Sequence, residues 1–317
     1  MSINIIGTGF YVPERVVTND ELANYVETND EWIVQRVGVH ERRVSVDETT
    51  ADFAVKAAKQ AIENSGIGVD EIDMIIAATV SPDNACPTVA GEVQKEIGAD
   101  CPAFDLNSAC SGFLFALDTA VSFIARGGIR NILVIGAERL SRILDWTDRS
   151  TCVIFGDGAG ACVVAPGDGY LSSRLYTKGG NDVIEIPSYC GSSPFFKGEE
   201  KKPYIFMAGQ ETFKFAVNRI SEDVKYVAEK AGISLEEIDY VVPHQANIRI
   251  IDFASKRLGI PKEKFFVNID KYGNTSSASI PIALAELNAS GKLKKGDIVA
   301  MTAFGGGLSS AACIIKW

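Results

Sequence analysis

Three polar residues carry the chemistry that this sequence could perform: Cys110, His244 and Asn274. Cys110 follows the strand-like run "PAFDL" and precedes the apolar, helix-like run "SGFLFALDTAVSFIA". A helix start leaves N–H groups unpaired at the positive end of the helix dipole, and such a location lowers the pKa of a thiol. The spacing therefore predicts a reactive thiolate at Cys110, with a buried structural thiol as the competing interpretation.

The two candidate partners lie in the second half of the chain. His244 ends the apolar run "YVVPHQAN", where it is a candidate acid–base group or a hydrogen-bonded structural histidine. Asn274 lies in "DKYGNTSSASIP", where an asparagine could also serve a turn or cap the following helix. The closing turn "FGGGLSS" could present backbone N–H groups to a developing oxyanion.

A faint internal repeat indicates how these residues are positioned. Residues 65–79, "SGIGVDEIDMIIAAT", align without gaps with residues 231–245, "AGISLEEIDYVVPHQ". Both predict a helix that ends at glycine, a short acidic loop and a buried strand. The position of His244 is occupied by Ala78 in the first copy. A second pair, "IFGDGAGACVV" and "AFGGGLSSAACII", supports a duplication.

Strands alternate with predicted helices at residues 50–65, 87–97 and 110–125, which indicates βαβ units and mixed sheets. The loop-rich stretch 166–203, with "YCGSSPFFKGEEKKP", places a boundary between halves 1–170 and 171–317. We expect an α/β fold in which the two duplicated halves, each with a mixed sheet, pack face to face as five layers, α/β/α/β/α. A ligand crevice is expected where the carboxyl ends of the strands meet.

Composition narrows the function classes. The 317 residues carry a net charge of −10, which argues against nucleic-acid or anionic-membrane binding. The uncharged run 298–315 is long enough to span a membrane, but "FGGGLSS" interrupts it, and we expect two buried strands. The N-terminus lacks the basic region of a signal peptide.

The cysteines form no C-x-x-C pair, and with two histidines no metal cluster is expected, which favours a reduced, cytoplasmic protein. The seven cysteines are Cys86, Cys101, Cys110, Cys152, Cys162, Cys190 and Cys313.

The ordered motifs "NSACSGF", "FGDGAGA", "PHQAN", "YGNTSSAS" and "FGGGLSSA" resemble the thiolase superfamily and, within it, the β-ketoacyl-acyl-carrier-protein synthase III family. The resemblance covers essentially the whole chain and implies a thiolase-like fold. Elongating condensing enzymes use a second catalytic histidine, whereas this chain has Asn274, and its other histidine is His40. Thiolases need a second catalytic cysteine where this chain has "FGGG", and chalcone synthases with a similar Cys-His-Asn set are longer.

The resemblance implies an initiating condensing enzyme of fatty-acid synthesis. Cys110 would take an acyl group from an acyl-CoA, and malonyl-acyl carrier protein would lose CO₂ to give an enolate. The side chains of His244 and Asn274 would stabilise that enolate, while the backbone N–H groups of Cys110 and Gly306 would form a separate oxyanion hole. No metal or redox cofactor is expected, and the family suggests a homodimer with no nucleic-acid or membrane partner.

The family pattern also assigns binding residues. For coenzyme A it implies Trp32, Arg36, Arg149 and Asn247. For the acyl pocket it implies Cys86, Leu140, Phe155 and Phe304. For carrier-protein docking it implies Lys214, Arg249, Lys256 and Arg257. A Trp-Arg pair could instead cap a helix surface, and the basic residues could form an ordinary solvated helix face.

Cys86 stands where family members often carry a bulkier phenylalanine that reaches across the dimer interface. We therefore expect acceptance of primers longer or more branched than acetyl. Three other functions remain open: a cysteine hydrolase, an idle acyl-CoA-binding protein, and an acyltransferase of specialised metabolism that serves another acceptor. The sequence does not identify the primer.

Overall fold

Two mixed β-sheets organise the chain in a computed structural model that describes residues 2–187, 194–195 and 201–317. The first sheet has the strand order β1 (Ser2–Tyr11), β7 (Gly158–Gly167), β6 (Ile132–Glu138), β4 (Met74–Ala78) and β5 (Ala103–Leu106). Strand β4 runs parallel to β5 and β6, whereas β7 is antiparallel to both of its neighbours. Much of the predicted boundary stretch "YCGSSPFFKGEEKKP", including Cys190, lies outside the described residues.

The second sheet is built from the C-terminal part of the chain. Its order is β11 (Tyr240–Pro243), β12 (Ile298–Gly305), β13 (Ser309–Lys316) and β8 (Tyr170–Thr177). The β11–β12 pair is parallel and the other two pairs are antiparallel. Residues 298–315 thus form two buried strands around a glycine turn, as predicted.

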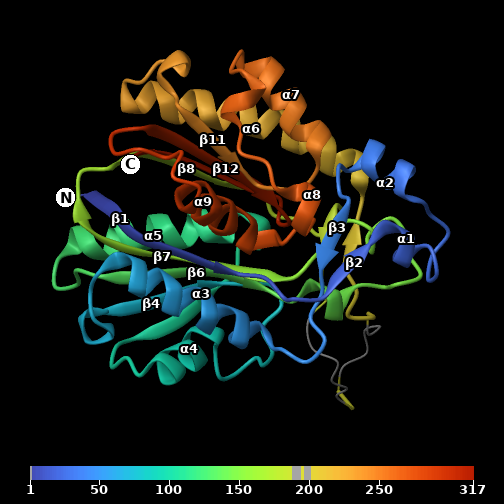
Figure 1. The fold of residues 1–317 in the computed structure, drawn as a ribbon, viewed down its shortest axis with the longest axis horizontal. Helices are drawn as coiled ribbons and strands as arrows, with labels where there is room; N and C mark the ends of the chain where they lie inside the picture. The colour runs from blue at the N-terminus through green and yellow to red at the C-terminus, as the bar shows by residue number, and fades with distance from the viewer. Residues whose placement is uncertain (1, 188–193, 196–200) are drawn as a thin grey trace.

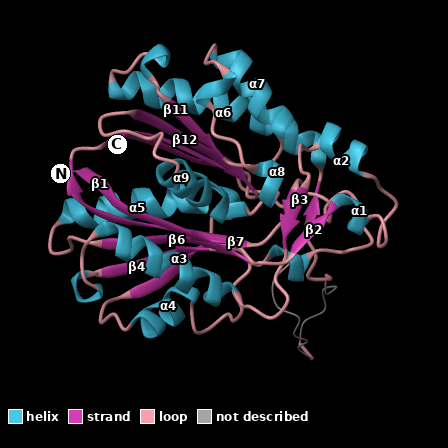
Figure 2. Cartoon of the chain, viewed as in Figure 1, coloured by secondary structure: helices cyan, strands magenta, loops and turns pink. Residues whose placement is uncertain are grey.

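Helices complete five layers, which Figures 1 and 2 show edge-on to the sheets. Between the sheets lie α5 (Gly112–Arg126) and α9 (Ser279–Ala289), whose apolar side chains share one core with both sheets. The outer layers are α3 (Thr50–Ser65) with α4 (Val89–Ile97) on one side and α6 (Gly209–Ala231) with α7 (Ile248–Leu258) on the other. The predicted α/β/α/β/α architecture with mixed sheets is confirmed.

The internal repeat is visible in the elements themselves. Helix α3 ends before Gly66 (φ 75°), a 3₁₀ turn η1 (Val69–Glu71) follows, and β4 begins. Helix α6 ends before Gly232 (φ 69°), followed by η4 (Leu235–Glu237) and β11. Left-handed backbone at both helix ends favours glycine, which explains why the repeat keeps it.

Several shorter elements lie beside one end of the sheets (Figure 1): β2 (Val16–Thr18), β3 (Glu41–Arg43), α1 (Asn19–Leu22), α2 (Asp30–Arg36) and α8 (Ile269–Tyr272). The other short elements are η2 (Ala109–Ser111), η3 (Leu140–Ile143), β9 (Ile184–Glu185), β10 (Phe206–Met207), η5 (Lys262–Lys264) and η6 (Ser276–Ala278). Several of them supply the candidate site.

One helical segment, Ala109–Arg126, has the length and apolar composition of a membrane span. It contains α5, whose side chains Phe113, Leu114 and Leu117 pack in the core between the two sheets. The apolar character of this segment is thus accounted for by burial within the protein.

Candidate active site

Cys110 lies in the 3₁₀ turn η2, between the end of β5 and the start of α5. The preceding Ala109 has a positive φ of 47°, a sparsely populated conformation for a residue with a side chain. The backbone of Gly305, at the end of β12, approaches so closely that an added Cβ would lie 2.7 Å from the Cys110 nitrogen. Only glycine allows this approach, which brings the second half of the chain against the nucleophile turn.

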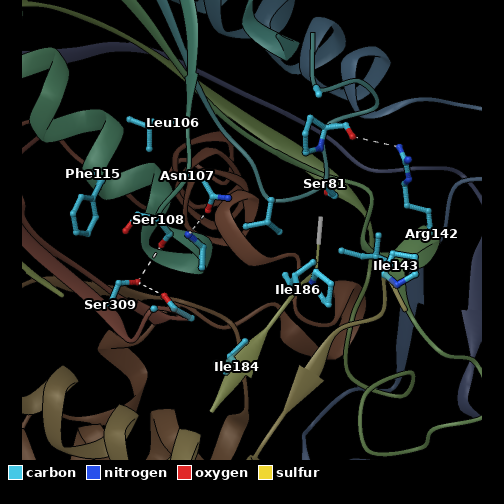
Figure 3. A pocket seen from close by; sticks show the side chains of 18 of the residues that line it. Ser81, Leu106, Asn107, Ser108, Phe115, Arg142, Ile143, Ile184, Ile186 and Ser309 are labelled. Atoms are coloured by element: carbon cyan, nitrogen blue, oxygen red, sulfur yellow. Dashed lines mark hydrogen bonds between the residues drawn. The ribbon is translucent and has the colours of Figure 1, made fainter. Parts of the chain in front are cut away.

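Serine hydroxyls join that turn to the glycine loop. Ser111 Oγ donates to the Ser108 carbonyl (2.7 Å) and lies 2.7 Å from Ser309 Oγ. Ser309 Oγ in turn bonds the carbonyls of Ser108 (3.1 Å) and Gly306 (2.9 Å). Figure 3 shows Ser108 and Ser309 at one wall of a cavity, with the bonds of Ser309 dashed. The Ser111–Ser309 contact therefore fixes the position of Gly306 relative to Cys110.

Asn274 is held by the first half of the chain. Its backbone N–H donates to the Ile154 carbonyl (2.9 Å), and its carbonyl accepts from Gly156 N–H (3.0 Å). The side-chain Oδ1 accepts from the Ser276 backbone N–H (2.8 Å), whereas Nδ2 has no hydrogen-bond partner among the described residues. The amide is thus oriented with its N–H₂ group available as a donor.

The turn after Asn274 is anchored to the first sheet. Ser276 has a positive φ of 49°, and Ser277 Oγ bonds the Ala78 carbonyl (2.8 Å) and Glu138 Oε1 (2.7 Å). An added Cβ on Gly136 would lie 2.4 Å from the Ser277 carbonyl oxygen, so β6 admits this turn because it carries glycine there. Left-handed backbone thus occurs at Ala109 and at Ser276, on both sides of the site, as is common at functional sites.

His244 follows β11 and is 1% exposed. Its Nδ1 lies 2.6 Å from Ser279 Oγ, at the start of α9, and its ring meets Phe304 edge-on with centroids 5.3 Å apart. Burial lowers the pKa of His244 to about 3, so the imidazole is neutral at pH 7. Ser279 was not singled out from the sequence, because its contact with His244 joins residues 35 positions apart.

The expected lowering of the Cys110 pKa is wrong. Burial raises the pKa of the thiol to about 12, and the nearby Glu138 adds a smaller effect in the same direction. Hydrogen bonding to the thiolate opposes the shift but does not cancel it. Desolvation is the largest of these effects. Cys110 lies in the 3₁₀ turn that precedes α5, not in the first turn of that helix, where the partial charge of the dipole acts most strongly.

A small apolar cavity of about 180 Å³ joins the two halves at the thiol. Cys110, Asn274 and Gly306 line it together with the predicted pocket residues Leu140 and Phe155. Phe304 does not line it; its ring packs against His244 instead. His244 is likewise absent from the lining of this cavity, so its ring is more enclosed than the other two candidates.

A second, wider cavity of about 850 Å³ opens beside the first (Figure 3). Both are lined by Val80, Ala109, Ile184, Ile186 and Gly306, so the two spaces meet at the nucleophile turn. Ile184 and Ile186 come from the stretch that the sequence marked only as a boundary loop. The alternation of apolar residues in this stretch was the sequence signal that could have identified them. Cys86 is exposed and lines neither cavity of its own chain.

The residues expected to bind coenzyme A lie together. The guanidinium groups of Arg149 and Arg36 are 5.3 Å and 5.8 Å from the Trp32 ring centroid, within cation–π range. Asn247 lines the small cavity, but its amide is also engaged: Oδ1 caps α7 at Arg249 N–H, and Nδ2 donates to the Arg36 carbonyl (3.0 Å). Asn247 thereby connects α2, the helix of Trp32, to the lining of the small cavity.

The expected docking residues lie on two adjacent helices. Lys214 is exposed on α6, while Arg249, Lys256 and Arg257 are exposed on α7. The Arg249 guanidinium lies 5.7 Å from the Phe213 ring centroid, and Arg257 donates to Asn218 Oδ1 (2.6 Å). The same α7 surface exposes Phe253, which is 42% accessible and was not expected from the sequence.

Comparisons with known proteins agree with this architecture. The family described as 3-oxoacyl-[acyl-carrier-protein (ACP)] synthase III matches residues 104–179, and the family of its C-terminal part matches residues 228–317. A curated relative from Clostridium acetobutylicum, named beta-ketoacyl-[acyl-carrier-protein] synthase III, is 50% identical over 323 residues, spanning 100% of this chain and 99% of the relative.

Solved structures give the same picture. The crystal structure of 3-oxoacyl-[acyl-carrier-protein] synthase III from Aquifex aeolicus matches with a TM-score of 0.93 and 47% identity, over 99% of this chain and 100% of that one. The priming beta-ketosynthase of the R1128 polyketide biosynthetic pathway matches with a TM-score of 0.93 and 35% identity, over 99% and 96% of the two chains.

Proposed function

The chain belongs to the 3-oxoacyl-[acyl-carrier-protein] synthase III family and is an acyltransferase, the initiating condensing enzyme of fatty-acid synthesis; we propose how its residues perform that reaction. The observation that carries the proposal is that Cys110 from one half and Asn274 from the other line one apolar cavity, together with Gly306. Nucleophile and hydrogen-bond donor thus face the same small volume.

The first half-reaction loads Cys110. Its sulfur attacks the thioester carbonyl of an acyl-CoA, the bond to the CoA sulfur breaks, and the thiol proton leaves with coenzyme A. Backbone N–H groups of Cys110 and Gly306 stabilise the tetrahedral oxyanion. The Ser111–Ser309 contact supports this step because it holds the two backbone segments at a fixed separation.

The second half-reaction makes the new carbon–carbon bond. Malonyl-acyl carrier protein loses CO₂, and the electron pair of the broken bond forms an enolate. Asn274 Nδ2 and the His244 ring donate to the enolate oxygen, and the enolate carbon attacks the acyl group on Cys110. The products are CO₂, 3-oxoacyl-acyl carrier protein and the Cys110 thiolate, which takes up a proton. These steps use no metal or redox cofactor.

Substrate binding is proposed from two surfaces. Trp32, Arg36 and Arg149 would hold the adenine and phosphates of coenzyme A, because aromatic and guanidinium groups suit those two chemistries. The basic surface of α6 and α7 would dock the acidic carrier protein through charge complementarity. A cytoplasmic location is proposed because both substrates are expected there.

The primer is proposed to include short branched acyl groups as well as acetyl. The side chains of Leu140, Phe155, Ile184, Ile186 and Ile205 give the small cavity an apolar lining, which suits an alkyl chain. Comparing turnover of acetyl-CoA and isobutyryl-CoA checks this expectation. Comparable rates are expected, whereas strict acetyl preference would contradict the role given to the small Cys86.

A homodimer is proposed from the first sheet. Strand β5 (Ala103–Leu106) forms an edge of that sheet, and all four of its residues are only partly buried. An exposed edge strand offers unpaired N–H and C=O groups, which a second copy can pair. Sedimentation of the intact protein should give twice the chain mass, and a monomer would contradict the pairing.

Intact-protein mass spectrometry tests the proposed reaction. Acetyl-CoA should add one acetyl group to the wild type and none to Cys110→Ala, and malonyl-acyl carrier protein should discharge it as acetoacetyl-carrier. Cys86→Ala, which removes an exposed thiol, is the matched control and should still be acetylated. An adduct that persists in Cys110→Ala would contradict the assignment of the nucleophile. Release of free acetate without carrier would contradict the condensing reaction and favour a hydrolase.

A second acceptor has one observation in its favour. The structure resembles, at 35% identity, a priming ketosynthase of a polyketide pathway. If wild-type protein forms the acetyl adduct but the fatty-acid malonyl-carrier fails to discharge it, the thiol assignment stands. The acceptor would then be a carrier of specialised metabolism, which the same experiment can test with that carrier.

A further inference from the structure

The hydrogen bond between His244 and Ser279 has a direction that bears on the reaction. Ser279 is 2% exposed and His244 is 1% exposed, so water does not readily satisfy either group. Within the part of the chain that the structure describes, Ser279 Oγ has two partners: His244 Nδ1 at 2.6 Å and the Gln245 backbone N–H at 3.4 Å.

The Gln245 N–H can only donate, so Ser279 Oγ is the acceptor in that contact. The hydroxyl hydrogen of Ser279 then needs an acceptor of its own, and the one within reach is His244 Nδ1. In the reverse arrangement Nδ1–H would donate to Oγ, and a buried hydroxyl hydrogen would be left unpaired, which is costly. We propose that Ser279 is a positioning residue whose hydroxyl donates to Nδ1 and holds His244 as the tautomer that carries its proton on Nε2.

The state of the ring supports this assignment. Burial lowers the pKa of His244 to about 3, so near neutral pH the imidazole has one N–H, and fixing one nitrogen determines the other. No described residue is hydrogen-bonded to Nε2, so that N–H is the donor that the proposed reaction requires. The backbone N–H of His244, in contrast, is committed to the Thr302 carbonyl (2.8 Å).

A single segment then orients both enolate donors. The Ser276 N–H occupies Asn274 Oδ1 and leaves its Nδ2 as donor, and three residues later the Ser279 hydroxyl occupies His244 Nδ1 and leaves Nε2–H. Residues 276–279 cover η6 and the first residue of α9, whose position is fixed by the Ser277 bonds to the first sheet. The effect of this tautomer on catalysis rests on the proposed function, whereas the tautomer itself is inferred from the hydrogen bonds alone.

The test uses the fact that the chain has two histidines, His40 and His244. Ring-¹⁵N-histidine labelling of the intact protein gives two imidazole systems, and a His40→Asn variant assigns them. Long-range ¹H–¹⁵N spectra should show Nε2–H for His244 in the wild type. Ser279→Ala should lose that preference, and Ser279→Thr, which keeps the hydroxyl, should retain it. Nδ1–H in the wild type, or an unchanged tautomer in Ser279→Ala, would overturn the inference.

Kinetics supply the second readout. Ser279→Ala should slow CO₂ release from malonyl-acyl carrier protein by about 5- to 150-fold, the factor set by one unpaired buried hydrogen-bonding group. Acetylation of Cys110 should change less than about threefold, because that step uses backbone N–H groups. Ser255→Ala is the control, because it removes another buried hydroxyl, one that donates to the Ile260 carbonyl. It should leave both rates unchanged. Equal loss in both half-reactions would mean that Ser279 is only structural.

The two claims can fail separately. If the wild type forms no acetyl adduct or releases no CO₂, the proposed function fails while the spectra still report the tautomer. If both half-reactions proceed and the spectra show Nδ1–H, the positioning role of Ser279 fails and the proposed function remains.

Discussion

Converting Asn274 to aspartate isolates the contribution of one enolate donor. In the structure Oδ1 accepts from Ser276 N–H (2.8 Å), and a carboxylate oxygen can keep that bond. The other oxygen replaces the N–H₂ group, so a donor becomes a negatively charged acceptor at the same place. Asn274→Asp therefore changes the charge and hydrogen-bonding character of the site with little change in shape.

The expected effect can be worked from these two changes. Removing one oxyanion donor costs about 2.7–4 kcal/mol of transition-state stabilisation, or about 10²- to 10³-fold in rate. A carboxylate about 4 Å from the enolate adds repulsion of roughly 4 kcal/mol at an effective dielectric of about 20. CO₂ release from malonyl-acyl carrier protein should therefore fall at least about 10³-fold. Acetylation of Cys110 should stay near the wild-type rate.

The pH dependence of this variant gives a second signature. Asn274 is 5% exposed, and burial raises the pKa of a carboxyl group introduced there. Below that pKa the group is protonated and neutral, and it can donate an O–H in place of the lost N–H. The residual rate of CO₂ release should therefore rise as the pH falls, in the opposite direction from a carboxylate acting as a base.

The assay combines intact mass of the acetyl adduct with measured CO₂ release. Asn288→Asp is the matched control, because Asn288 is a partly buried residue of α9 whose Nδ2 donates to Thr8 Oγ1 (3.1 Å), and it should affect neither half-reaction. Wild-type CO₂ release by Asn274→Asp would refute the donor role. Loss of both half-reactions with unchanged thermal stability would also refute it.

Three further predictions concern other parts of the site. Because burial raises the pKa of Cys110 to about 12, its alkylation by iodoacetamide should keep rising through pH 10, and a plateau below pH 9 would contradict the buried thiol. Ser309→Ala should lower the melting temperature and slow Cys110 acetylation more than Ser111→Ala, because it leaves the Gly306 carbonyl without its hydroxyl donor, at a cost of about 1–3 kcal/mol. The reverse order in thermal and adduct assays would contradict the role given to the Ser309 bonds. Arg249→Glu should raise KM for malonyl-acyl carrier protein at low salt and leave acetylation by acetyl-CoA unchanged, whereas equal loss with both substrates would argue against docking.

Local patterns in the sequence predicted the framework well. In both copies of the repeat, a helix that ends at glycine, a short acidic loop and an apolar run predicted the strands β4 and β11. The structure has a helix end, a 3₁₀ turn and a strand at both places. Cys110 and His244 were recognisable because His244 comes directly after a strand and Cys110 lies in the short connection between a strand and a helix. Such features depend on neighbours within a few residues, which a single sequence records.

What the sequence did not predict depends on distant contacts. Ser279 acquires its importance from a residue 35 positions away, and Ser111 from Ser309, 198 positions away. The direction of the Cys110 pKa shift was mispredicted because depth of burial is a property of the assembled halves, whereas the helix start is a local feature. Phe304 was expected in the acyl pocket, but in β12 its side chain packs against the ring of His244.

The two pKa shifts together separate a condensing site from a hydrolytic one. Burial raises the pKa of Cys110 to about 12 and lowers that of His244 to about 3, so both shifts favour the neutral thiol and imidazole over a thiolate–imidazolium pair. A cysteine hydrolase needs that ion pair to attack and then needs water activated by a base. A neutral His244 that presents N–H is instead suited to an enolate oxygen and poorly suited to deprotonating water.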